Sequence, residues 1–294
     1  MLAAVPVIGV VELLAHVRQT RDVASDDDWR AAREDVAKSL HPEDLLIFAP
    51  RWVEPIGRRW MQSDLATMGR MTFADASRYK RAVEVSIRGK HAAELTGWKS
   101  AQTDRFGGIE VTTWENPAYA PVIDDPLDVL RMHVSYTQGG IERDCGLEHT
   151  APQTAGTYFP PGMPIPSDRF NCGNALVAVT VLSALDYSGR RCVVAAPAQG
   201  MRLRVRFAKV KLGKALHGNH GLYAEHERNK TGAPVTIDLS VGGKPIGRAS
   251  HRDGEGWSYF EIPTPDLAGQ AADVVAEISS SGGDRSYCFE VTSR

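Results

Sequence analysis

Apolar residues first repeat along the chain with the spacing of a helix. Four of them lie three or four positions apart and therefore share one helix face: Trp29, Ala32, Val36 and Leu40. The acidic run Asp26-Asp27-Asp28 precedes them, where the helix macrodipole favours negative charge, and Pro42 follows. The pattern predicts an amphipathic helix that begins near residue 26 and ends before residue 42.

A continuous apolar run of strand length comes next, Leu45–Ala49, and Pro50 ends it. A strand that is apolar at every position is typical of a parallel strand buried on both faces. A helical turn at 74–79 and a second strand at 82–87 repeat the pattern, and 109–114 alternates as an edge strand would. Residues 23–125 are therefore predicted to form a small α/β layer domain with three or four strands.

From residue 126 onward the helical periodicity disappears and short strand-like runs replace it. Turn residues such as Gly242-Gly243 and Asp253-Gly254 separate eight runs: Leu130–Tyr136, Ala175–Leu182, Cys192–Ala195, Leu203–Val210, Val235–Val241, Trp257–Ile262, Val274–Ile278 and Tyr287–Val291. Many short strands with regular turns indicate a β-sandwich, and eight suit a jelly roll. The predicted fold class is α+β and multi-domain, with the small α/β domain followed by an all-β jelly-roll sandwich at 126–294.

The N-terminal residues 2–15 are strongly apolar except for Glu12. The run is shorter than the roughly 20 residues that span a bilayer, and it lacks the basic leader and cleavage site of a secretory signal. One interpretation is a buried amphipathic helix. The interpretation that we favour is a remnant of a membrane anchor in residues 1–22, although Arg18 and Arg21 would then face the cytoplasm, which counts against export.

Composition excludes several classes of protein. The chain has 34 basic and 36 acidic residues, a formal charge of −2, with 43% hydrophobic and 24% charged residues. These values are ordinary for a globular protein and exclude a disordered or fibrous chain. Neither part of the chain is basic enough to bind nucleic acid, so no nucleic-acid partner is expected.

Four cysteines lie in the β region, Cys145, Cys172, Cys192 and Cys288, and none has the CxxC spacing of a zinc or thioredoxin motif. An even number permits two disulfides in an oxidising compartment, with three possible pairings. We favour Cys145–Cys172, at the base of a long loop over 146–168, and Cys192–Cys288, between two strands. The alternative is that all four are reduced and act as small hydrophobic residues.

Searches for catalytic constellations give none. His217 and His220 flank Gly218-Asn219, which favours a turn, and the glutamate of a zinc-peptidase helix is missing from this cluster. The chain has no GxSxG elbow, no phosphate-binding P-loop and no dinucleotide fingerprint after a predicted strand. No catalytic residue, metal site or cofactor is therefore predicted.

Several segments carry a resemblance to a known kind of module. They are Asp28-Trp29-Arg30, HPEDLLIFAPRW at 41–52, Arg78-Tyr79 and EVSIRG at 84–89, followed by Arg190-Arg191-Cys192, Gly256-Trp257 and Tyr287-Cys288-Phe289. The chain resembles, over about residues 26–294, an extracytoplasmic module of bacterial envelope proteins. Such modules are associated with membrane-embedded, lipid-carrier-dependent glycosyltransferases of the dolichyl-phosphate mannosyltransferase-like kind. The C-terminal part is similar to galactose-binding-like jelly rolls.

The chain lacks the transmembrane helices and the acidic catalytic motif of those transferases, so the resemblance implies only their soluble, envelope-facing part. It implies a non-catalytic protein on the periplasmic side of the cell envelope. The apolar run favours attachment of that protein to the membrane through residues 1–22. Its expected partners are a glycan or lipid-linked sugar, or another envelope protein. Two alternatives stay open: a structural or interaction subunit of a larger assembly, and an enzyme acting on carbohydrate or its lipid carrier.

Sugar sites typically combine an aromatic platform with planar polar side chains, because a pyranose has an apolar C–H face and a rim of hydroxyl groups. The candidate glycan-binding residues lie on two predicted loops, with His217, His220, Tyr223 and Arg228 in one and His251, Arg252 and Trp257 in the other. Each has a structural alternative, such as Trp257 in the core or Tyr223 hydrogen-bonded to Arg228.

A candidate anion site follows the first predicted strand. Arg51-Trp52 lies at the carboxyl end of that strand, the edge at which open α/β sheets bind ligands. Arg51, with Arg58 and Arg59, would suit a lipid-linked phosphate or an anionic headgroup, because arginine binds phosphate bidentately. The alternative is that residues 51–60 form an ordered loop that packs Trp52 and Trp60.

Overall fold

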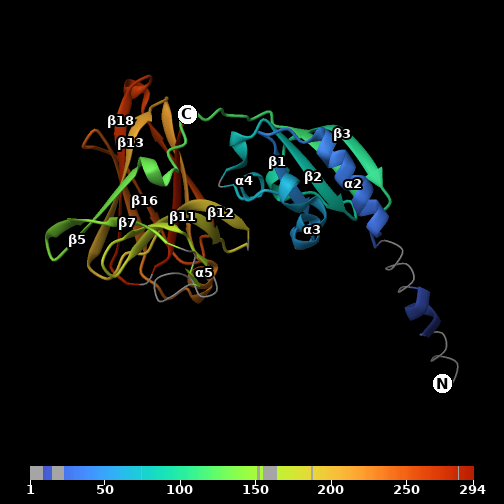
Figure 1. The fold of residues 1–294 in the computed structure, drawn as a ribbon, viewed down its shortest axis with the longest axis horizontal. Coiled ribbons are helices and arrows are strands. Elements are labelled where there is room, and N and C mark those ends of the chain that lie inside the picture. The colour runs from blue at the N-terminus through green and yellow to red at the C-terminus, as the bar shows by residue number, and fades with distance from the viewer. Residues whose placement is uncertain are drawn as a thin grey trace. The chain divides into compact units, whose positions relative to one another are not determined.

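A computed structural model describes residues 9–14, 23–73, 75–150, 153–154, 164–186, 188–283 and 285–294 (Figure 1). These residues form two compact units. The first comprises the described residues up to 71 together with 76–120, and the second comprises 72–75 together with 121–294. Each unit has its own sheets and hydrophobic core, so each is described by itself.

The first unit contains a four-stranded sheet with the strand order β1-β2-β4-β3. The strands are β1 (Leu45–Ala49), β2 (Arg81–Ile87), β3 (Lys99–Phe106) and β4 (Ile109–Glu115), and the helices are α2 (Asp26–Ser39), α3 (Glu54–Leu65) and α4 (Met68–Met71). Strands β1 and β2 are parallel, and every residue of β1 is buried. The prediction of a fully buried parallel strand is therefore confirmed.

Helix α2 begins with a capping box, in which Ser25 and Asp28 each bond the backbone N–H of the other. Its apolar face buries Trp29, Ala32 and Val36 in one core with alternate residues of β1, β2 and β4. The predicted helix is thus present, and the acidic first turn lies where the macrodipole stabilises it.

Strand β4 is an interior strand, so the prediction of an edge strand at 109–114 is wrong. Strand β3 pairs with it and forms the edge of the sheet. The sequence of β3, KSAQTDRF, is largely polar and exposed, so it has no apolar alternation to reveal it. Such polar edges are typical, because they discourage pairing with another chain.

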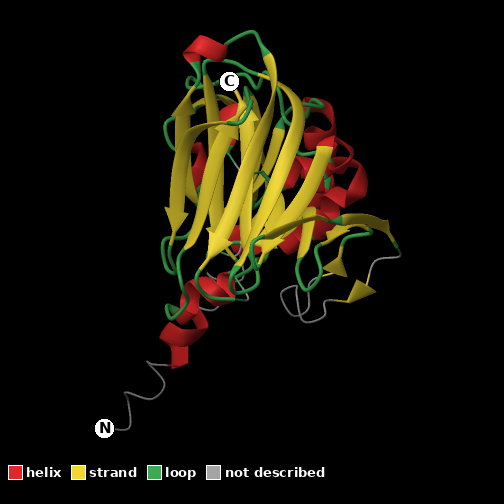
Figure 2. Cartoon of the chain, turned by 90° about the vertical axis from the view of Figure 1, so that its left-hand side faces the viewer, coloured by secondary structure: helices red, strands yellow, loops and turns green. Residues whose placement is uncertain are grey.

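The second unit is a β-sandwich of a seven-stranded sheet, β17-β14-β19-β12-β11-β10-β7, and a six-stranded sheet, β16-β15-β18-β13-β5-β6. Figure 2 draws its strands in yellow. The eight predicted runs are all strands: β5 (Met132–Gln138), β11 (Leu176–Ser183), β12 (Gly189–Ala195), β13 (Met201–Lys211), β15 (Val235–Val241), β17 (Ser258–Pro263), β18 (Ala271–Ser280) and β19 (Tyr287–Ser293). The predicted fold class is confirmed.

Further elements of this unit had no clear pattern in the sequence. They are β6 (Ile141–Asp144), β7 (Gly146–His149), β8 (Gln153–Thr154), β9 (Pro164–Ile165), β10 (Asp168–Asn171), β14 (Ala215–Leu222), β16 (Lys244–His251) and helix α5 (Ala224–Asn229). Strands β7 and β10 show that both ends of the segment predicted as a long loop belong to the sheet.

Strand β13 illustrates how the sandwich buries its core. Leu203, Val205 and Phe207 are buried, whereas the arginines between them are exposed. These arginines and Arg202 before them have carboxylate partners in the same sheet: Arg202 with Glu277 and Arg206 with Asp273, both on the adjacent β18, and Arg204 with Glu142 on β6. The alternation therefore separates an apolar inner face from a charge-paired outer face.

Strand β14 replaces the predicted turn at Gly218-Asn219, and that prediction is wrong. It lies between β17 and β19. A Cβ atom at Gly218 would come within 2.0 Å of the Phe260 ring, so this position has to be glycine. The glycine permits a close approach of strand and ring rather than a turn.

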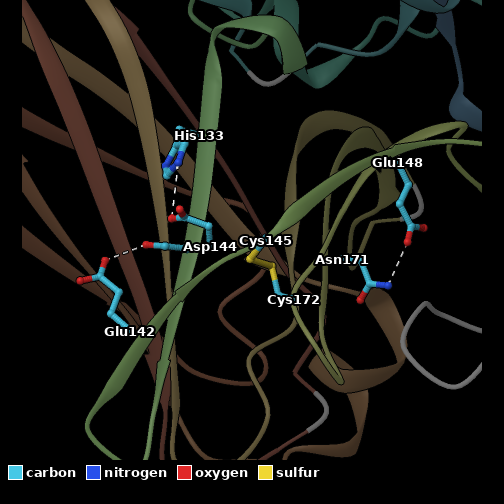
Figure 3. The surroundings of a disulfide bond; sticks show 8 residues. His133, Glu142, Asp144, Cys145, Glu148, Asn171 and Cys172 are labelled. Atoms are coloured by element: carbon cyan, nitrogen blue, oxygen red, sulfur yellow. Dashed lines mark hydrogen bonds and ion pairs between the residues drawn. A yellow bond between two sulfur atoms is a disulfide. The ribbon is translucent and has the colours of Figure 1, made fainter.

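Both predicted disulfide pairings are confirmed. Cys145 pairs with Cys172 next to the β7–β10 ladder, and Cys192 of β12 pairs with Cys288 of β19. Around the first disulfide, Asn171 donates to Glu148 and His133 lies 3.5 Å from Asp144 (Figure 3). Disulfides persist in oxidising compartments, so they favour an exported domain.

Residues 9–14 are helical and exposed, and the remainder of the predicted anchor at 1–22 lies outside the described residues. Among the helices that the structure describes, none has the length and apolar character needed to cross a membrane.

Removing the two disulfides separately should lower stability by different amounts. The pairs close chain separations of 27 and 96 residues, for which loop entropy predicts about 3.5 and about 4.7 kcal/mol. We expect Cys192→Ala/Cys288→Ala to lower the free energy of unfolding by about 1 kcal/mol more than Cys145→Ala/Cys172→Ala, measured by urea titration. All four cysteines are buried, so each pair controls for the other. Equal losses would contradict this expectation.

Candidate functional site

Two of the histidines predicted to bind a glycan are buried at one end of the sandwich. His220 is 3% exposed and His251 is 0% exposed. His251 Nε2 lies 2.6 Å from Glu227 Oε1, and the same carboxylate accepts hydrogen bonds from the backbone N–H groups of Leu222 and Gly254. This network fastens α5 to the turn after β16. The burial argues against contact of either histidine with a ligand.

Burial and neighbouring groups shift the pKa values of Glu227 and of His220. Burial, the largest influence, would raise the pKa of Glu227, but the hydrogen bonds from His251 and the backbone lower it below its ordinary value. Burial, helped by the proximity of His251, lowers the pKa of His220 to about 4. His220 is therefore neutral near pH 7, with its Nδ1 atom 2.6 Å from the Tyr287 hydroxyl.

The other sandwich candidates are spread over several elements. His217 lies on β14, where its Nδ1 atom is 2.9 Å from the hydroxyl of Tyr259, an exposed residue that the sequence did not single out. Tyr223 packs edge-on against His226, and Trp257 is half-buried with the Arg190 guanidinium 5.7 Å from its ring centroid. Arg228 and Arg252 are exposed, on α5 and in the turn after β16. None of the seven candidates lines either cavity described below.

The segment 51–60 is helical, so its prediction as a loop is wrong: a short 3-10 helix, Arg51–Val53, leads directly into α3. Arg51 forms an ion pair with Glu94, and Arg58 lies 3.8 Å from Glu54 one helical turn away. Arg59 instead lines a cavity. The structure therefore separates the three arginines that the sequence grouped together.

This cavity has a volume of about 700 Å³ and belongs entirely to the first unit. Its lining comes from the start of α2, from α3 and from the carboxyl ends of β1 and β2: Val23, Ala24, Asp26, Trp29, Trp52, Val53, Ile56, Arg59, Trp60, Gln62, Ile87 and Arg88. We call it the Trp52 cavity. Its size lies within the range of small-ligand sites.

Parallel pairing brings Trp52 and Arg88 to the same edge of the sheet. Ala49, the last residue of β1, is in register with Ser86 near the end of β2. The chain then continues to Trp52 in one case and Arg88 in the other, and the guanidinium carbon of Arg88 lies 5.8 Å from the Trp52 ring centroid. The position of Trp52 agrees with the expectation of a ligand edge.

Three tryptophans line the Trp52 cavity at different depths. Trp29 is buried, Trp60 is half-buried with the Arg30 guanidinium 5.9 Å from its ring centroid, and Trp52 is 57% exposed. Trp52 shares its exposure with Ile56 and Val23 of the same lining, and grouped exposed apolar residues are the kind of surface that marks a binding site. Sequence reasoning missed Arg88, although Arg88-Gly89 directly follows the second predicted strand.

Two residues with strained backbone conformations also line this cavity. Four non-glycine residues in the described ranges have a positive φ: Gln62, Arg88, Lys209 and Lys230. Gln62 and Arg88 both line the Trp52 cavity. Gln62, with φ 57° and ψ 179°, occupies a region that is almost exclusive to glycine. Strain of this kind costs roughly 1–3 kcal/mol and is concentrated at ligand sites.

A second cavity, of about 600 Å³, lies in the sandwich unit. It is lined by Asp125, Leu127, Asp128, Val129, Pro166, Ser167, Asp168, Val179 and Arg191, with no aromatic residue. Arg191 donates to the Leu127 carbonyl at 2.7 Å, and Asp168 lies 2.5 Å from His149. Because Arg191 and Asp168 already have these partners and the described lining has no aromatic platform, it is the weaker candidate.

No family model matches the sequence, and no curated protein matches it. Solved structures that match part of the chain include a CBM51 module from Clostridium perfringens in complex with methyl-galactose, at 6% identity and a TM-score of 0.29, covering 40% of this chain and 81% of that one. A xylan-binding module, CBM15, matches at 11% identity and a TM-score of 0.26, covering 54% and 90%. The CBM51-2 and INT domains of Clostridium perfringens ZmpB match at 9% identity and a TM-score of 0.31, covering 67% of this chain and 40% of that one. At such low scores these likenesses carry no conclusion about the ligand of this chain.

The buried neutral His220 should make stability depend on pH. The unfolded chain binds a proton near pH 6.5, whereas folded His220 does so only near pH 4. Its contribution is therefore complete above pH 6.5 and is lost as the pH falls from 6.5 to 4, by roughly 3 kcal/mol. We expect His220→Asn to flatten this part of the stability curve, measured by urea unfolding at a series of pH values. The exposed His149→Asn is the control, and an unchanged slope in His220→Asn would contradict the assignment.

The strain at Gln62 can be tested by glycine substitution. Gln62→Gly should raise the free energy of unfolding by about 1 kcal/mol, because glycine occupies the observed backbone conformation without strain. The neighbouring Ser63→Gly, in regular helical conformation, should lower it by about 0.5 kcal/mol. Thermal unfolding of the two variants measures whether stability rises in Gln62→Gly and falls in Ser63→Gly. A loss of stability in both would show that Gln62 is not strained.

Proposed function

We propose that the protein is an exported carbohydrate-binding protein without catalytic activity, and that its ligand binds in the Trp52 cavity. The observation that carries this proposal is the exposed indole of Trp52 beside the planar guanidinium of Arg88, at the mouth of a cavity of about 700 Å³. It joins an aromatic platform to planar polar groups, the combination that suits a pyranose.

The apolar part of the site would contact the C–H face of a sugar ring. Burying an exposed indole against such a face removes apolar surface of both partners from water, which is favourable by roughly 25 cal/mol per Å². Ile56 and Val23, which are also exposed, extend the apolar surface around Trp52.

The polar part would bind the hydroxyl rim. Asp26 and Gln62 line the same cavity and offer a carboxylate and an amide, whereas Arg59 and Arg88 supply N–H donors. Groups of this kind give orientation and specificity, because an unpaired buried hydroxyl is costly.

The cellular setting forms part of the proposal. The two disulfides support export to an oxidising compartment. We place the protein on the periplasmic side of the cell envelope, anchored through residues 1–22. Association with a lipid-carrier-dependent glycosyltransferase or another envelope protein rests on the sequence resemblance alone. The accessible sandwich residues Tyr223, Arg228, Arg252 and Trp257 are retained as a second glycan-binding candidate.

Replacing Trp52 should abolish most of the binding. Immobilised oligosaccharides, neutral and acidic, first identify a ligand of the full chain, and calorimetry then measures its Kd. We expect Trp52→Ala to weaken binding at least tenfold through loss of the aromatic platform. Tyr119→Ala, which removes another exposed aromatic residue of the same unit outside the cavity lining, should leave the Kd unchanged.

Two outcomes would contradict the proposal. Failure of every saccharide to bind the wild-type chain would rule out the function. Binding that persists in Trp52→Ala but is lost in Trp257→Ala would place the site in the sandwich instead.

A further inference from the structure

Most arginines of the first unit that form an ion pair lie outside the lining of the Trp52 cavity. Six have a carboxylate partner: Arg30 with Asp27, Arg33 with Asp64, Arg51 with Glu94, Arg58 with Glu54, Arg81 with Asp44 and Arg105 with Glu110. Within the described part of the chain, Arg59 and Arg88 have no ion-pair partner, and both line the Trp52 cavity. Arg70 donates instead to the backbone carbonyls of Asp64 and Leu65. The two guanidinium groups in the cavity lining are thus without a carboxylate partner among the described residues.

From this distribution we infer that the Trp52 cavity selects an anionic pyranose, a sugar ring that carries a carboxylate or a phosphate. The inference rests on the proposed function and names its ligand class. Arg59 and Arg88 would bind the anionic group, since a guanidinium matches carboxylate and phosphate oxygens with two parallel hydrogen bonds.

The only carboxylate in the described lining is Asp26, on the first turn of α2. Two guanidinium groups and one carboxylate leave the lining with a net charge of +1. Arg59 and Arg88 are both exposed, so an anion in solution can reach them. Because neither has an ion-pair partner in the described ranges, the anion would bind without breaking an existing ion pair. A neutral sugar gains nothing from this charge.

The apolar residues of the same lining indicate that the ligand contains a sugar ring in addition to its negative charge. Trp52, Ile56 and Val23 are exposed and would stay in contact with water if a bare inorganic anion bound. The Arg88 guanidinium lies over the Trp52 ring, so an anion bound to Arg88 is held next to the indole. The ligand therefore has to present an apolar ring face and a negative charge a few ångströms apart.

The test compares each anionic ligand with an uncharged counterpart, with calorimetry on the full chain. Trigalacturonate is set against its methyl ester, and glucose 1-phosphate against glucose, each at low and at high salt. We expect at least one anionic ligand to bind tenfold or more tightly than its neutral counterpart, and the preference to shrink at high salt. The pair that shows the preference identifies carboxylate or phosphate as the source of the charge.

Variants assign the preference to the two arginines. Arg59→Gln/Arg88→Gln should reduce the preference, taken as the ratio of the neutral to the anionic Kd, to less than threefold, because glutamine keeps an N–H donor but removes the charge. Arg58→Gln/Arg105→Gln removes the same charge from positions outside the cavity lining and should keep the preference. Thermal unfolding confirms that each variant is folded.

Failure of the inference is distinguishable from failure of the proposed function. Equal binding of charged and neutral sugars, with loss of both in Trp52→Ala, would overturn the anion preference alone. Binding of only other, neutral oligosaccharides would also overturn the anion preference alone, whereas binding of no saccharide at all would overturn both. Inorganic phosphate binding as tightly as glucose 1-phosphate would show a simple anion site and would also overturn the inference.

Discussion

The parallel pairing of β1 with β2 is the constraint on which the candidate site depends. Parallel strands end at the same edge of a sheet, so the residues that follow them are neighbours in space although they are far apart in sequence. Here that edge receives Trp52 after β1 and Arg88 after β2. Helices α2 and α3 pack on the apolar face of these strands and complete the cavity wall with Trp29, Trp60 and Arg59.

The sandwich is ordered by a different set of interactions. Its inner faces form one continuous apolar core, and Cys192–Cys288 joins two neighbouring strands of the seven-stranded sheet. At one end, the buried carboxylate of Glu227 holds His251 and the backbone of the following turn. Histidines that resembled a ligand cluster in the sequence are therefore part of the structure's hydrogen bonding, and the free polar and aromatic surface of the Trp52 cavity becomes the stronger candidate.

Much of the fold could be predicted because most of its strands have a recognisable apolar pattern in the sequence. LLIFA of β1 and the alternation of β13 are examples. The favoured cysteine pairing, one of three that the sequence permits, is the one observed. Strands β3 and β14 could not be predicted, because one is polar and the other contains Gly218 for a close approach rather than a turn. Of the three arginines predicted to form an anion site, only Arg59 lines the cavity. Arg51 and Arg58 are paired through contacts that spacing alone does not reveal, and Arg88 reaches the cavity only through strand register.

The central claim is that ligand binds at Trp52 and not on the sandwich. The most direct measurement is a titration of the ¹⁵N-labelled full chain with trigalacturonate and glucose 1-phosphate, following the indole N–H signals of the six tryptophans, each assigned by substitution with phenylalanine. The account predicts that the signals of Trp52 and Trp60 shift while that of Trp257 stays in place. A shift of Trp257 with Trp52 and Trp60 unchanged would contradict it.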